Sequence, residues 1–460
     1  MDIDTIAALS TAPGLGAIAI VRISGPDAFR LFETLAPEEG GDRPKARVAT
    51  LVKLVDPDEG NVLDHALVTC FPGPDSYTGE DVVEISCHGG TLVPQLVLDA
   101  CLRAGARDAE PGEFTRRAYL HGRMDLVQAE AVGDVIHARS RALHRAAVGQ
   151  LDRGLSERVG ALRRAMLGLE AQLAHHIDFP EEDDPPVPLE GIRAEAEALA
   201  GRLEHMLATA PEGELLREGA LVVLAGLPNV GKSSLYNAML GRERAIVTEQ
   251  PGTTRDALEA EIELGGFPFR VVDTAGLRDT EERIERLGIE VTRRYLDGAD
   301  VILLCVEAGG GMGASEKAFL EEHAERNVLV VETKADAAAP GDGDMGSQAP
   351  ASAGQVPIRV SAKTGEGLDA LREGLLGLVF GGLVSASPEV PVITRRRHAR
   401  ALGEALEAVR EFGKALDAGV PPEMASAHLR SGESALEDVL GVISTDDVLD
   451  VVFRDFCVGK

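Results

Sequence analysis

Hydrophobic and polar positions follow two different periods along this chain, and the changes of period mark its parts. Over the first 120 or so residues, strand and helix patterns alternate. A period of two covers residues 17–23, another strand pattern covers 82–87, and an apolar helical stretch then runs to Ala104. We therefore expect a small α+β domain over residues 1–120.

A helical period of three to four residues then replaces this mixture. Hardly any helix breaker occurs between about residues 125 and 178, which predicts a long helix with one apolar stripe. The stripe consists of Leu151, Leu155, Val159, Leu162, Met166, Leu169 and Leu173. A second helix is expected over 189–207, and helical periodicity returns beyond residue 380, at Leu402, Leu406, Val409, Phe412 and Leu416.

The segment between these helices carries a phosphate-binding pattern. The run GLPNVGKS at 226–233 has two glycines with four residues between them, followed by Lys232 and Ser233. An apolar strand pattern precedes it and a helical pattern follows, so the run is a P-loop whose backbone N–H groups face a polyphosphate. Lys232 would reach the outer phosphates, and the Ser233 hydroxyl would ligate Mg²⁺.

Three companion motifs follow strand patterns in the order that GTP-binding domains use. Asp273 opens the run DTAG, where a carboxylate holds magnesium through water and a glycine N–H senses the γ-phosphate. The run TKAD at 333–336 follows the next strand, and its Asp336 can accept from the N–H groups of guanine while Lys334 covers the base. The run SAK at 361–363 would complete the base pocket. Together the motifs predict a GTPase of the translation-factor-like class.

The motifs also contain two departures from common GTPase patterns. Thr333 stands where an Asn usually ties the base loop to the P-loop, so we expect somewhat looser nucleotide holding. Leu277 stands where Ras-like proteins place a glutamine that orients the attacking water, and a leucine cannot do so. The water must therefore be oriented by another group, and Thr254 is the candidate second protein ligand of Mg²⁺.

These patterns predict a multidomain α/β and α protein. An N-terminal α+β domain (1–120) precedes a discontinuous helical domain (121–218 and 381–460), and a Ras-like P-loop GTPase domain with a parallel sheet (219–380) is inserted into the helices. Because the GTPase domain is covalently continuous with the helices at both ends, a nucleotide-driven conformational change in this domain would be transmitted to the helices.

Composition narrows the setting in which the protein works. Lys and Arg total 46 against 76 Asp and Glu, a net charge of −30, so the whole molecule repels polyanions and any nucleic-acid role needs a local basic patch or a partner. The five cysteines show no metal-ligand spacing, which favours a reducing, cytoplasmic compartment. The sequence shows neither a signal peptide pattern nor an apolar run long enough to span a membrane. We therefore do not expect a membrane protein.

Further short motifs occur along the whole chain: TAPG at 11–14 with RISG at 22–25, PGEFTRRA at 111–118, DLVQAEA at 125–131 and the terminal FCVGK at 456–460. Together with the GTPase motifs, they make the chain resemble, over its whole length, the MnmE (TrmE) family of tRNA modification GTPases. The family typically ends Cys-Ile-Gly-Lys, so Val458 is a mild departure.

The resemblance implies a homodimer joined through N-terminal domains that bind a tetrahydrofolate one-carbon donor, as methylene- or formyl-tetrahydrofolate. With the FAD-dependent partner MnmG, the family adds an aminomethyl or carboxymethylaminomethyl group to C5 of the wobble uridine of certain tRNAs, with the tRNA held largely by the partner. Potassium-dependent pairing of the GTPase domains activates hydrolysis. Arg22, Glu84, Arg123 and Lys460 match the folate positions, Arg123 replacing the usual Lys, and Cys457 is a candidate for chemistry.

By the same motif match, the catalytic residues are Lys232, Asn229 and Glu285, the last as the water-orienting group. The potassium ligands are Asn229, Thr248, Gln250 and Thr253, and the magnesium ligands are Ser233 and Thr254. The expected GTP-binding residues are Asn229, Val230, Gly231, Lys232, Ser233, Ser234, Thr248, Glu249, Gln250, Pro251, Gly252, Thr253, Thr254, Asp273, Thr274, Ala275, Gly276, Thr333, Lys334, Asp336, Ser361, Ala362 and Lys363.

Two alternatives stay open on the sequence. The chain could be a regulatory GTPase of ribosome assembly whose flanking domains bind RNA or protein without one-carbon chemistry. A basic cluster, TRRRHAR at 394–400, could meet tRNA phosphates or a partner, although a capped helix start explains it almost as well.

Overall fold

The computed structural model describes residues 4–37, 44–178, 188–242, 244–245, 259–274, 293–338, 356–385, 391–442, 446–454 and 456–460. The chain forms two compact units. Unit 1 contains residues 1–133, 151–160 and 437–460, and unit 2 contains residues 134–150 and 161–436. Each unit is described by itself.

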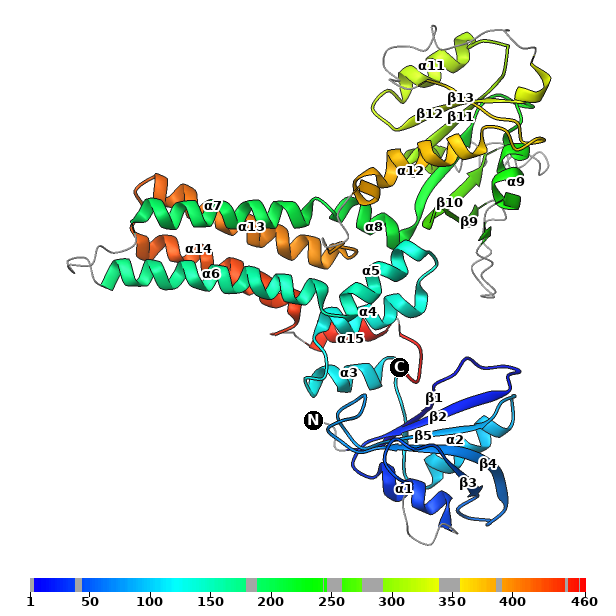
Figure 1. The fold of residues 1–460 in the computed structure, drawn as a ribbon, viewed down its shortest axis with the longest axis vertical. Helices are drawn as coiled ribbons and strands as arrows, with labels where there is room; N and C mark the ends of the chain where they lie inside the picture. The colour runs from blue at the N-terminus through cyan, green and yellow to red at the C-terminus, as the bar shows by residue number, and fades with distance from the viewer. Residues whose placement is uncertain are drawn as a thin grey trace. The chain divides into compact units, whose positions relative to one another are not determined.

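Unit 1 is built on a six-stranded sheet with the order β3-β4-β5-β2-β1-β6 (Figure 1). Its neighbouring strands pair antiparallel, except that β6 runs parallel to β1. The strands are β1 (Ile6–Leu9), β2 (Ile18–Ser24), β3 (Thr50–Val55), β4 (Val62–Phe71), β5 (Val82–His88) and β6 (Arg107–Asp108). Helices α1 (Ala28–Leu35) and α2 (Val93–Arg103) share one core with one face of this sheet, which confirms the expected α+β fold.

The other face of the sheet carries apolar side chains that remain exposed. Leu51 pairs with Leu67 across β3 and β4, and both point to the face opposite the α1–α2 core. Leu51 is 65% exposed and Leu67 is 47% exposed, and Ile18 on β2 is 64% exposed. Neighbouring exposed leucines and isoleucines of this kind are typical of an interaction surface.

The C-terminal end of the chain belongs to unit 1. Helix α3 (Glu113–Leu120) and the start of α4 (Leu126–His137) pack with α15 (Asp446–Arg454) around Leu126, Phe453 and Phe456. Beyond α15, Val458 forms a β-bridge with Pro111, next to the N-terminal end of α3. The last residues are therefore part of the N-terminal fold.

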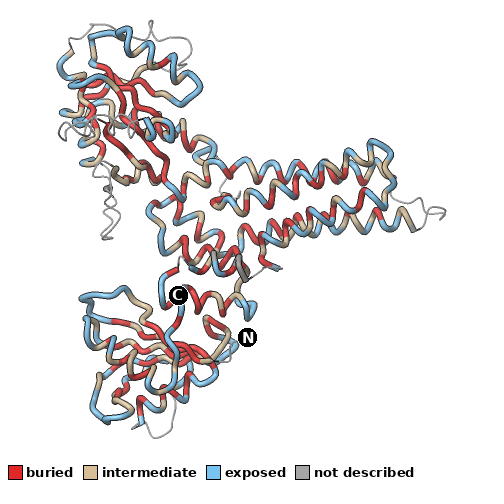
Figure 2. The backbone as a smooth tube through the Cα atoms, turned by 180° about the vertical axis from the view of Figure 1, so that it is seen from behind, coloured by how far each residue is buried: buried red, intermediate tan, exposed pale blue. Residues whose placement is uncertain are grey.

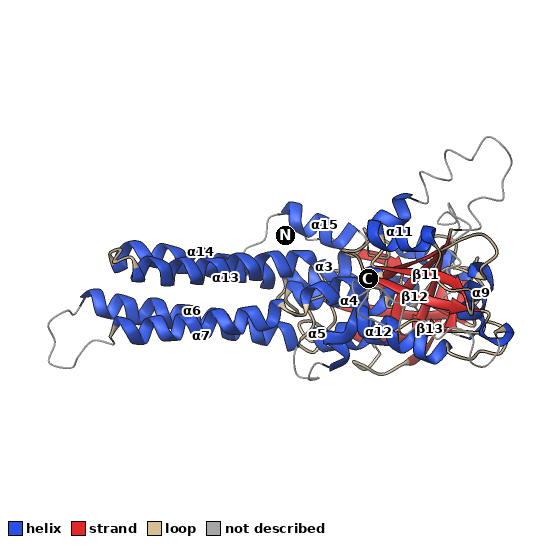
Figure 3. Ribbon diagram, turned by 90° about the horizontal axis from the view of Figure 1, so that it is seen from above, coloured by secondary structure: helices blue, strands red, loops and turns tan. Residues whose placement is uncertain are grey.

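Four long helices, most of whose residues belong to unit 2, run side by side (Figures 1 and 3). They are α6 (Gly154–Asp178), α7 (Leu189–Leu207), α13 (Arg396–Asp417) and α14 (Pro422–Leu440). Figure 2 shows that buried and exposed residues alternate along these helices. The predicted stripe on α6 is buried from Leu155 to Leu173, and α7 has the predicted bounds.

The expectation of one unbroken helical run from 125 to 178 was wrong. The chain forms α4, α5 (Arg141–Leu151) and α6, with a break before Arg141 and another at Arg153. Ser140 accepts a hydrogen bond from Leu143 N (3.2 Å), which is an N-terminal cap, and Arg153 has a left-handed φ of 66°. Neither Ser nor Arg is a strong helix breaker, so composition gave no sign of these turns.

The inserted domain is a seven-stranded sheet with the order β13-β12-β11-β7-β10-β9-β8. The strands are β7 (Ala220–Ala225), β8 (Arg244–Ala245), β9 (Glu259–Leu264), β10 (Phe267–Asp273), β11 (Val301–Glu307), β12 (Val328–Thr333) and β13 (Ile358–Arg359). Its helices include α9 (Lys232–Arg242), α11 (Ala314–Glu322) and α12 (Leu368–Ser385), and a 3₁₀ turn η3 covers Ala335–Ala337. The central strands are parallel, as the α/β prediction required.

The chain passes between the helices and the inserted domain twice, and hydrogen bonds join the two crossings. The first crossing runs through α8 (Ala210–Glu218) into β7, and the second follows a kink in α12 at Phe380 (φ −124°, ψ 22°). The Glu212 carboxylate on α8 accepts from the N–H groups of Gly382 (2.9 Å) and Leu383 (2.6 Å), which start the helical turn after the kink. A carboxylate at a helix start satisfies N–H groups that would otherwise lack partners.

Gly213 brings the crossings to backbone contact. A Cβ on Gly213 would lie 2.1 Å from Ile393 O, closer than any real contact. Beside it, Ile393 N donates to Thr209 Oγ1 at 3.1 Å. A β9–β10 hairpin also contacts the helices, because Ala142 N at the start of α5 donates to Gly266 O at 2.9 Å. No helix in the described part of the chain is both long and apolar enough to cross a membrane.

We expect Gly213→Ala to destabilise the protein by about 1–3 kcal/mol, because the new methyl group must push the two crossings apart. Gly201→Ala, on the exposed side of α7 with no atom within 4 Å of the added Cβ, is the matched control and should stabilise by up to about 1 kcal/mol. Urea unfolding followed by circular dichroism measures both. Equal midpoints for the two variants would show that the crossings need not touch.

Candidate functional site

The GTPase motifs meet at one edge of the inserted sheet. β7 lies between β10 and β11 and is parallel to both, and β12 is parallel to β11. Since parallel strands present their carboxyl ends at the same edge, the P-loop after β7, Asp273 at the end of β10 and Thr333 at the end of β12 are neighbours. This edge is where open α/β sheets bind ligands.

The P-loop conformation depends on its glycines and on Asn229. Gly226 has φ 139°, and a Cβ there would lie 2.4 Å from Cys305 O. Asn229 has a left-handed φ of 63°, a region that Asn tolerates better than most residues. The Lys232 ammonium donates to Gly226 O (3.0 Å) and Leu227 O (2.7 Å), so it lies against the loop. Asn229 itself is exposed.

Ser233 and Asp273 place a hydroxyl and a carboxylate side by side. The Ser233 hydroxyl donates to Asp273 Oδ2 at 2.5 Å, and the Asp273 residue is 5% exposed. Hydroxyl and carboxylate oxygens are the ligands that Mg²⁺ prefers, and this pair stands at the first turn of α9, whose dipole favours phosphate. The residues present therefore fit a magnesium ion. The neighbouring Thr274 hydroxyl donates to Leu224 O at 2.7 Å and fixes the end of β10 on β7.

Thr333 supplies a tie between the base loop and the P-loop, although it replaces an Asn. Its buried hydroxyl lies within hydrogen-bond distance of Val230 O in the P-loop and 3.0 Å from Val306 O on β11. A hydroxyl has one hydrogen, so it donates fully to one carbonyl or shares the bond between them. The connection between the base loop and the P-loop that an Asn usually makes is thus made here by the shorter side chain of Thr333.

The base-binding residues are also connected. The buried Ser361 hydroxyl donates to Asp336 Oδ1 at 2.7 Å, and this hydrogen bond lowers the pKa of Asp336. Thr364 N in turn donates to Ser361 Oγ at 3.1 Å, which fixes the loop that contains Ala362 and Lys363. Lys334 has a left-handed φ of 56°, and its ammonium pairs with Glu307 at 3.1 Å. The Asp336 carboxylate is thereby kept ionised and oriented.

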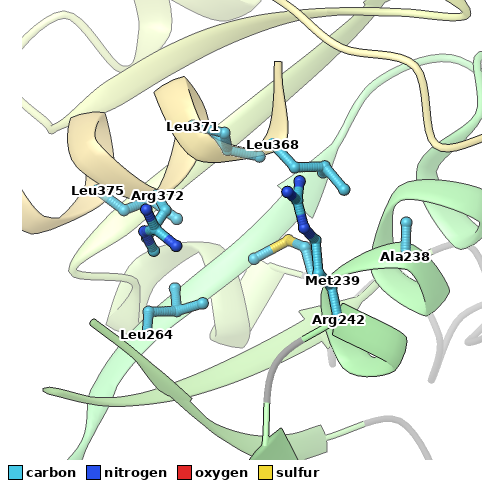
Figure 4. A pocket seen from close by; sticks show the side chains of 8 residues that line it. All are labelled: Ala238, Met239, Arg242, Leu264, Leu368, Leu371, Arg372 and Leu375. Atoms are coloured by element: carbon cyan, nitrogen blue, oxygen red, sulfur yellow. The ribbon is translucent and has the colours of Figure 1, made fainter. Parts of the chain in front are cut away.

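Arg242 makes a second set of contacts to the base loop that the sequence did not suggest. Arg242, the last residue of α9, donates to Gly365 O and to Asp369, both at 3.1 Å. Figure 4 shows Arg242 beside a small apolar pocket between α9 and α12, lined also by Met239, Leu264 and Leu371. One helix therefore contacts the phosphate edge at its first residue and the base loop at its last.

Several predicted site residues lie outside the described residues. They are Thr248, Glu249, Gln250, Pro251, Gly252, Thr253 and Thr254, with Ala275, Gly276, Leu277 and Glu285. The potassium loop, the second magnesium ligand and the water-orienting glutamate therefore stay predictions.

Unit 1 brings together a second group of predicted residues. Arg22 on β2 and Glu84 on β5 are register partners, and their side chains form an ion pair at 2.8 Å. Arg22 Nη1 also donates to Gly459 O at 3.3 Å, and the Ser10 hydroxyl donates to the same carbonyl at 3.0 Å. The C-terminal residues thus lie at a polar site that the strands β2 and β5 carry.

The remaining predicted residues of this group have different surroundings. Arg123 contacts Asp75 at 3.9 Å rather than the Arg22–Glu84 pair. Lys460 is half-buried, and its backbone N–H donates to Cys457 O at 3.3 Å. Cys457 is exposed, whereas the other four cysteines are buried, and burial raises the pKa of Cys87 to about 11 and of Cys101 to about 12. Cys457 thus differs from the other cysteines in its exposure, and a chemical role for it stays a prediction.

The basic cluster at 394–400 is largely neutralised. Arg395 pairs with Asp134 at 2.7 Å, and Arg400 pairs with Glu404 at 2.8 Å. Arg396, the first residue of α13, pairs with Glu214 at 3.0 Å and with Glu218 at 3.2 Å. Arg395 and Arg396 hold the start of α13 against neighbouring elements, whereas Arg400 pairs with a residue of α13 itself.

We expect Thr333→Val to speed release of GDP about fivefold, because the isosteric side chain leaves the Val230 carbonyl without its hydroxyl partner. Thr333→Ser keeps the hydroxyl and should stay close to the unaltered protein. Stopped-flow measurement of fluorescent GDP release from the full chain compares the three. Release from the Val variant at the unaltered rate would show that the hydroxyl does not tie the loops.

Comparison with known proteins follows the same division of the chain. The model of the GTP-binding protein TrmE N-terminus matches residues 5–123, and the model of the MnmE helical domain matches residues 126–457. The chain is 42% identical over 461 residues to a tRNA modification GTPase MnmE of Moorella thermoacetica, covering 99% of both chains. It is also 42% identical over 465 residues to the MnmE of Heliobacterium modesticaldum, again over 99% of both.

Among solved structures, the chain is similar to the G domain of the T. maritima FeoB iron transporter, with 28% identity and a TM-score of 0.27. That match covers 35% of this chain and 98% of the other. The full-length relatives and the two family models agree with the motifs, the inserted GTPase sheet and the helices around it. The chain belongs to the MnmE family of tRNA modification GTPases, and it is a GTP hydrolase that acts in tRNA modification.

Proposed function

We propose that this protein is a potassium-activated GTPase that helps to modify C5 of the wobble uridine of certain tRNAs. In this proposal it works in the cytoplasm as a homodimer with the flavoprotein MnmG, uses a tetrahydrofolate one-carbon unit, and adds an aminomethyl or carboxymethylaminomethyl group. Its domains are 1–120, 121–218 with 381–460, and 219–380. One observation supports the one-carbon part above the others: Gly459 of the C-terminal tail meets Arg22, which is paired with Glu84.

The nucleotide edge supports the hydrolytic part. The Ser233 and Asp273 oxygens would hold Mg²⁺, and the Lys232 ammonium, which lies against the loop, would turn to the phosphates. Asp336, oriented by Ser361, would accept from the N–H groups of guanine. Positive charge near the β- and γ-phosphates stabilises the transition state of phosphoryl transfer. A potassium ion beside Asn229 would supply such charge, and the residue presents an exposed amide in the loop.

The polar site of unit 1 fits a folate. A carboxylate such as Glu84 can accept from the paired N–H groups of a pterin ring, and the arginine beside it keeps that carboxylate charged and oriented. Lys460 and Arg123 would offer positive charge to the acidic tail of a folate. Cys457 is the exposed thiol nearest in sequence to these residues, and a chemical role for it is part of the proposal.

The exposed apolar face of the unit 1 sheet supports the homodimer. Leu51, Leu67 and Ile18 lie on the face that α1 and α2 leave uncovered. A second copy would cover the same side chains by two-fold symmetry, and burying them would contribute about 25 cal/mol per Å² of apolar surface.

The first test is GTP turnover in potassium against sodium buffer at equal ionic strength. The unaltered chain should turn over GTP at least about tenfold faster in potassium, since an added cation at the phosphates lowers the barrier by more than ~1.4 kcal/mol. Asn229→Ala should bring the ratio of the two rates to one. Asn229→Gly, which suits the left-handed φ of 63°, should do the same without backbone strain. Equal rates in both buffers for the unaltered chain would contradict the potassium mechanism.

The second test concerns the homodimer. Leu51→Asp combined with Leu67→Asp should convert the dimer to a monomer in sedimentation equilibrium, because two charges would be buried without partners. Leu167→Asp, at a 37% exposed position on α6, is the control and should remain a dimer. A double variant that sediments as a dimer would place the interface elsewhere.

A further inference from the structure

The segment 111–118, PGEFTRRA, has no part in the GTPase site, yet its residues converge on the Arg22–Glu84 pair. Pro111 forms the bridge to Val458, and Gly112 N donates to Cys457 O at 3.4 Å. Gly112 has φ 69°, and a Cβ there would lie 2.8 Å from Phe453 O. The C-terminal tail thus packs against the start of α3.

Two further residues of the segment act on Arg22, Phe114 by direct contact and Thr115 through Tyr77. The Arg22 guanidinium lies 5.5 Å from the centre of the Phe114 ring and 5.4 Å from the centre of the Tyr77 ring, both within the range of cation–π attraction. Phe114 is fully buried. Its neighbour Thr115, also fully buried, is 2.8 Å from the Tyr77 hydroxyl. One turn of α3 therefore supplies one aromatic neighbour of Arg22 and anchors the other.

Arg22 already uses all three of its nitrogens within the protein. Nε donates to Glu84 at 3.0 Å, Nη2 pairs with the same carboxylate at 2.8 Å, and Nη1 donates to Gly459 O at 3.3 Å. Its side chain is 13% exposed. Both contacts from Arg22 go to Glu84 Oε1, so Arg22 orients the carboxylate without using Oε2.

The loop that carries Tyr77 is fastened to α3 a second time. Arg117, 6% exposed, donates to Glu80 at 3.2 Å and pairs with Glu113 at 2.9 Å. Glu80 also accepts from the Ser24 hydroxyl at 2.7 Å. Because both ends of the 77–80 stretch are bound to α3 or to β2, the Tyr77 ring has a fixed place beside Arg22.

We propose that Tyr77 and Thr115 are positioning residues of the folate site: the hydrogen bond between their hydroxyls holds the Tyr77 ring against Arg22, and Arg22 then holds Glu84 and the C-terminal tail in the geometry that binds a reduced folate. This inference rests on the folate role proposed above. Thr115 touches no ligand in this scheme and acts through Tyr77 and Arg22.

Calorimetric titration of the full chain with 5-formyltetrahydrofolate tests the inference. Tyr77→Phe and Thr115→Val each remove one hydroxyl and keep the shape of the side chain, so each should raise the Kd about fivefold, the effect of one lost hydrogen bond. The double variant should bind no worse than either single variant, because the same bond is lost. Thr115→Ser should restore the affinity of the unaltered chain.

Thr209→Val is the matched control, since it removes a buried hydroxyl from unit 2 and should leave the Kd unchanged. A purely structural role of the bond would lower the thermal midpoint without changing the Kd, and that result overturns the inference. Additive effects of Tyr77→Phe and Thr115→Val overturn it as well. If the unaltered chain binds no folate, the proposed folate role itself fails. If it binds folate and the variants bind it equally well, only the inference about Tyr77 and Thr115 fails.

Discussion

The structure of unit 2 depends on one close contact, the approach of Gly213 to the Ile393 carbonyl. A domain inserted into a helical domain requires two chain crossings, and both must leave and enter the helices at the same place. Gly213 permits that approach because it has no side chain, and Glu212 then satisfies the N–H groups of Gly382 and Leu383 that the kink in α12 exposes. Leu216 from the first crossing and Phe380 from the second join the core of the inserted sheet.

The same contact region extends to the nucleotide edge through β10. Its first residue, Phe267, stacks on Phe380 with ring centres 4.8 Å apart, and its last residue, Asp273, accepts from Ser233. At the turn before Phe267, the Gly266 carbonyl accepts from the first turn of α5. A strand seven residues long thus joins the helices at one end and the Ser233–Asp273 pair at the other. This gives the covalent insertion a second, non-covalent route by which a change at the phosphates would reach the helices.

In unit 1, the C-terminal tail and segments of the N-terminal domain meet at one polar site. The C-terminal tail, the first turn of α3, the strands β2 and β5, and the loop of Tyr77 come from distant parts of the chain, and their polar groups meet around Arg22. Because the tail contributes a carbonyl to this site, the family's characteristic ending has a structural explanation in addition to any chemical one. Gly459, with φ 93° and no room for a Cβ beside Leu9 O, requires glycine for that approach.

The sequence by itself determined the α/β and helical elements, the P-loop and its companion motifs, because local periodicity and short motifs record what each segment buries or binds. It also placed Arg22 and Glu84 among the candidates through the family resemblance. Only the tertiary structure decided that Thr333 reaches Val230 and that Arg242 holds the base loop. It also decided that Phe114 and Tyr77 lie beside Arg22 and that Thr115 bonds to Tyr77. It also decided the helix breaks at Ser140 and Arg153. These contacts join residues far apart in the chain or depend on backbone turns, and no local pattern encodes which distant partner a side chain will meet.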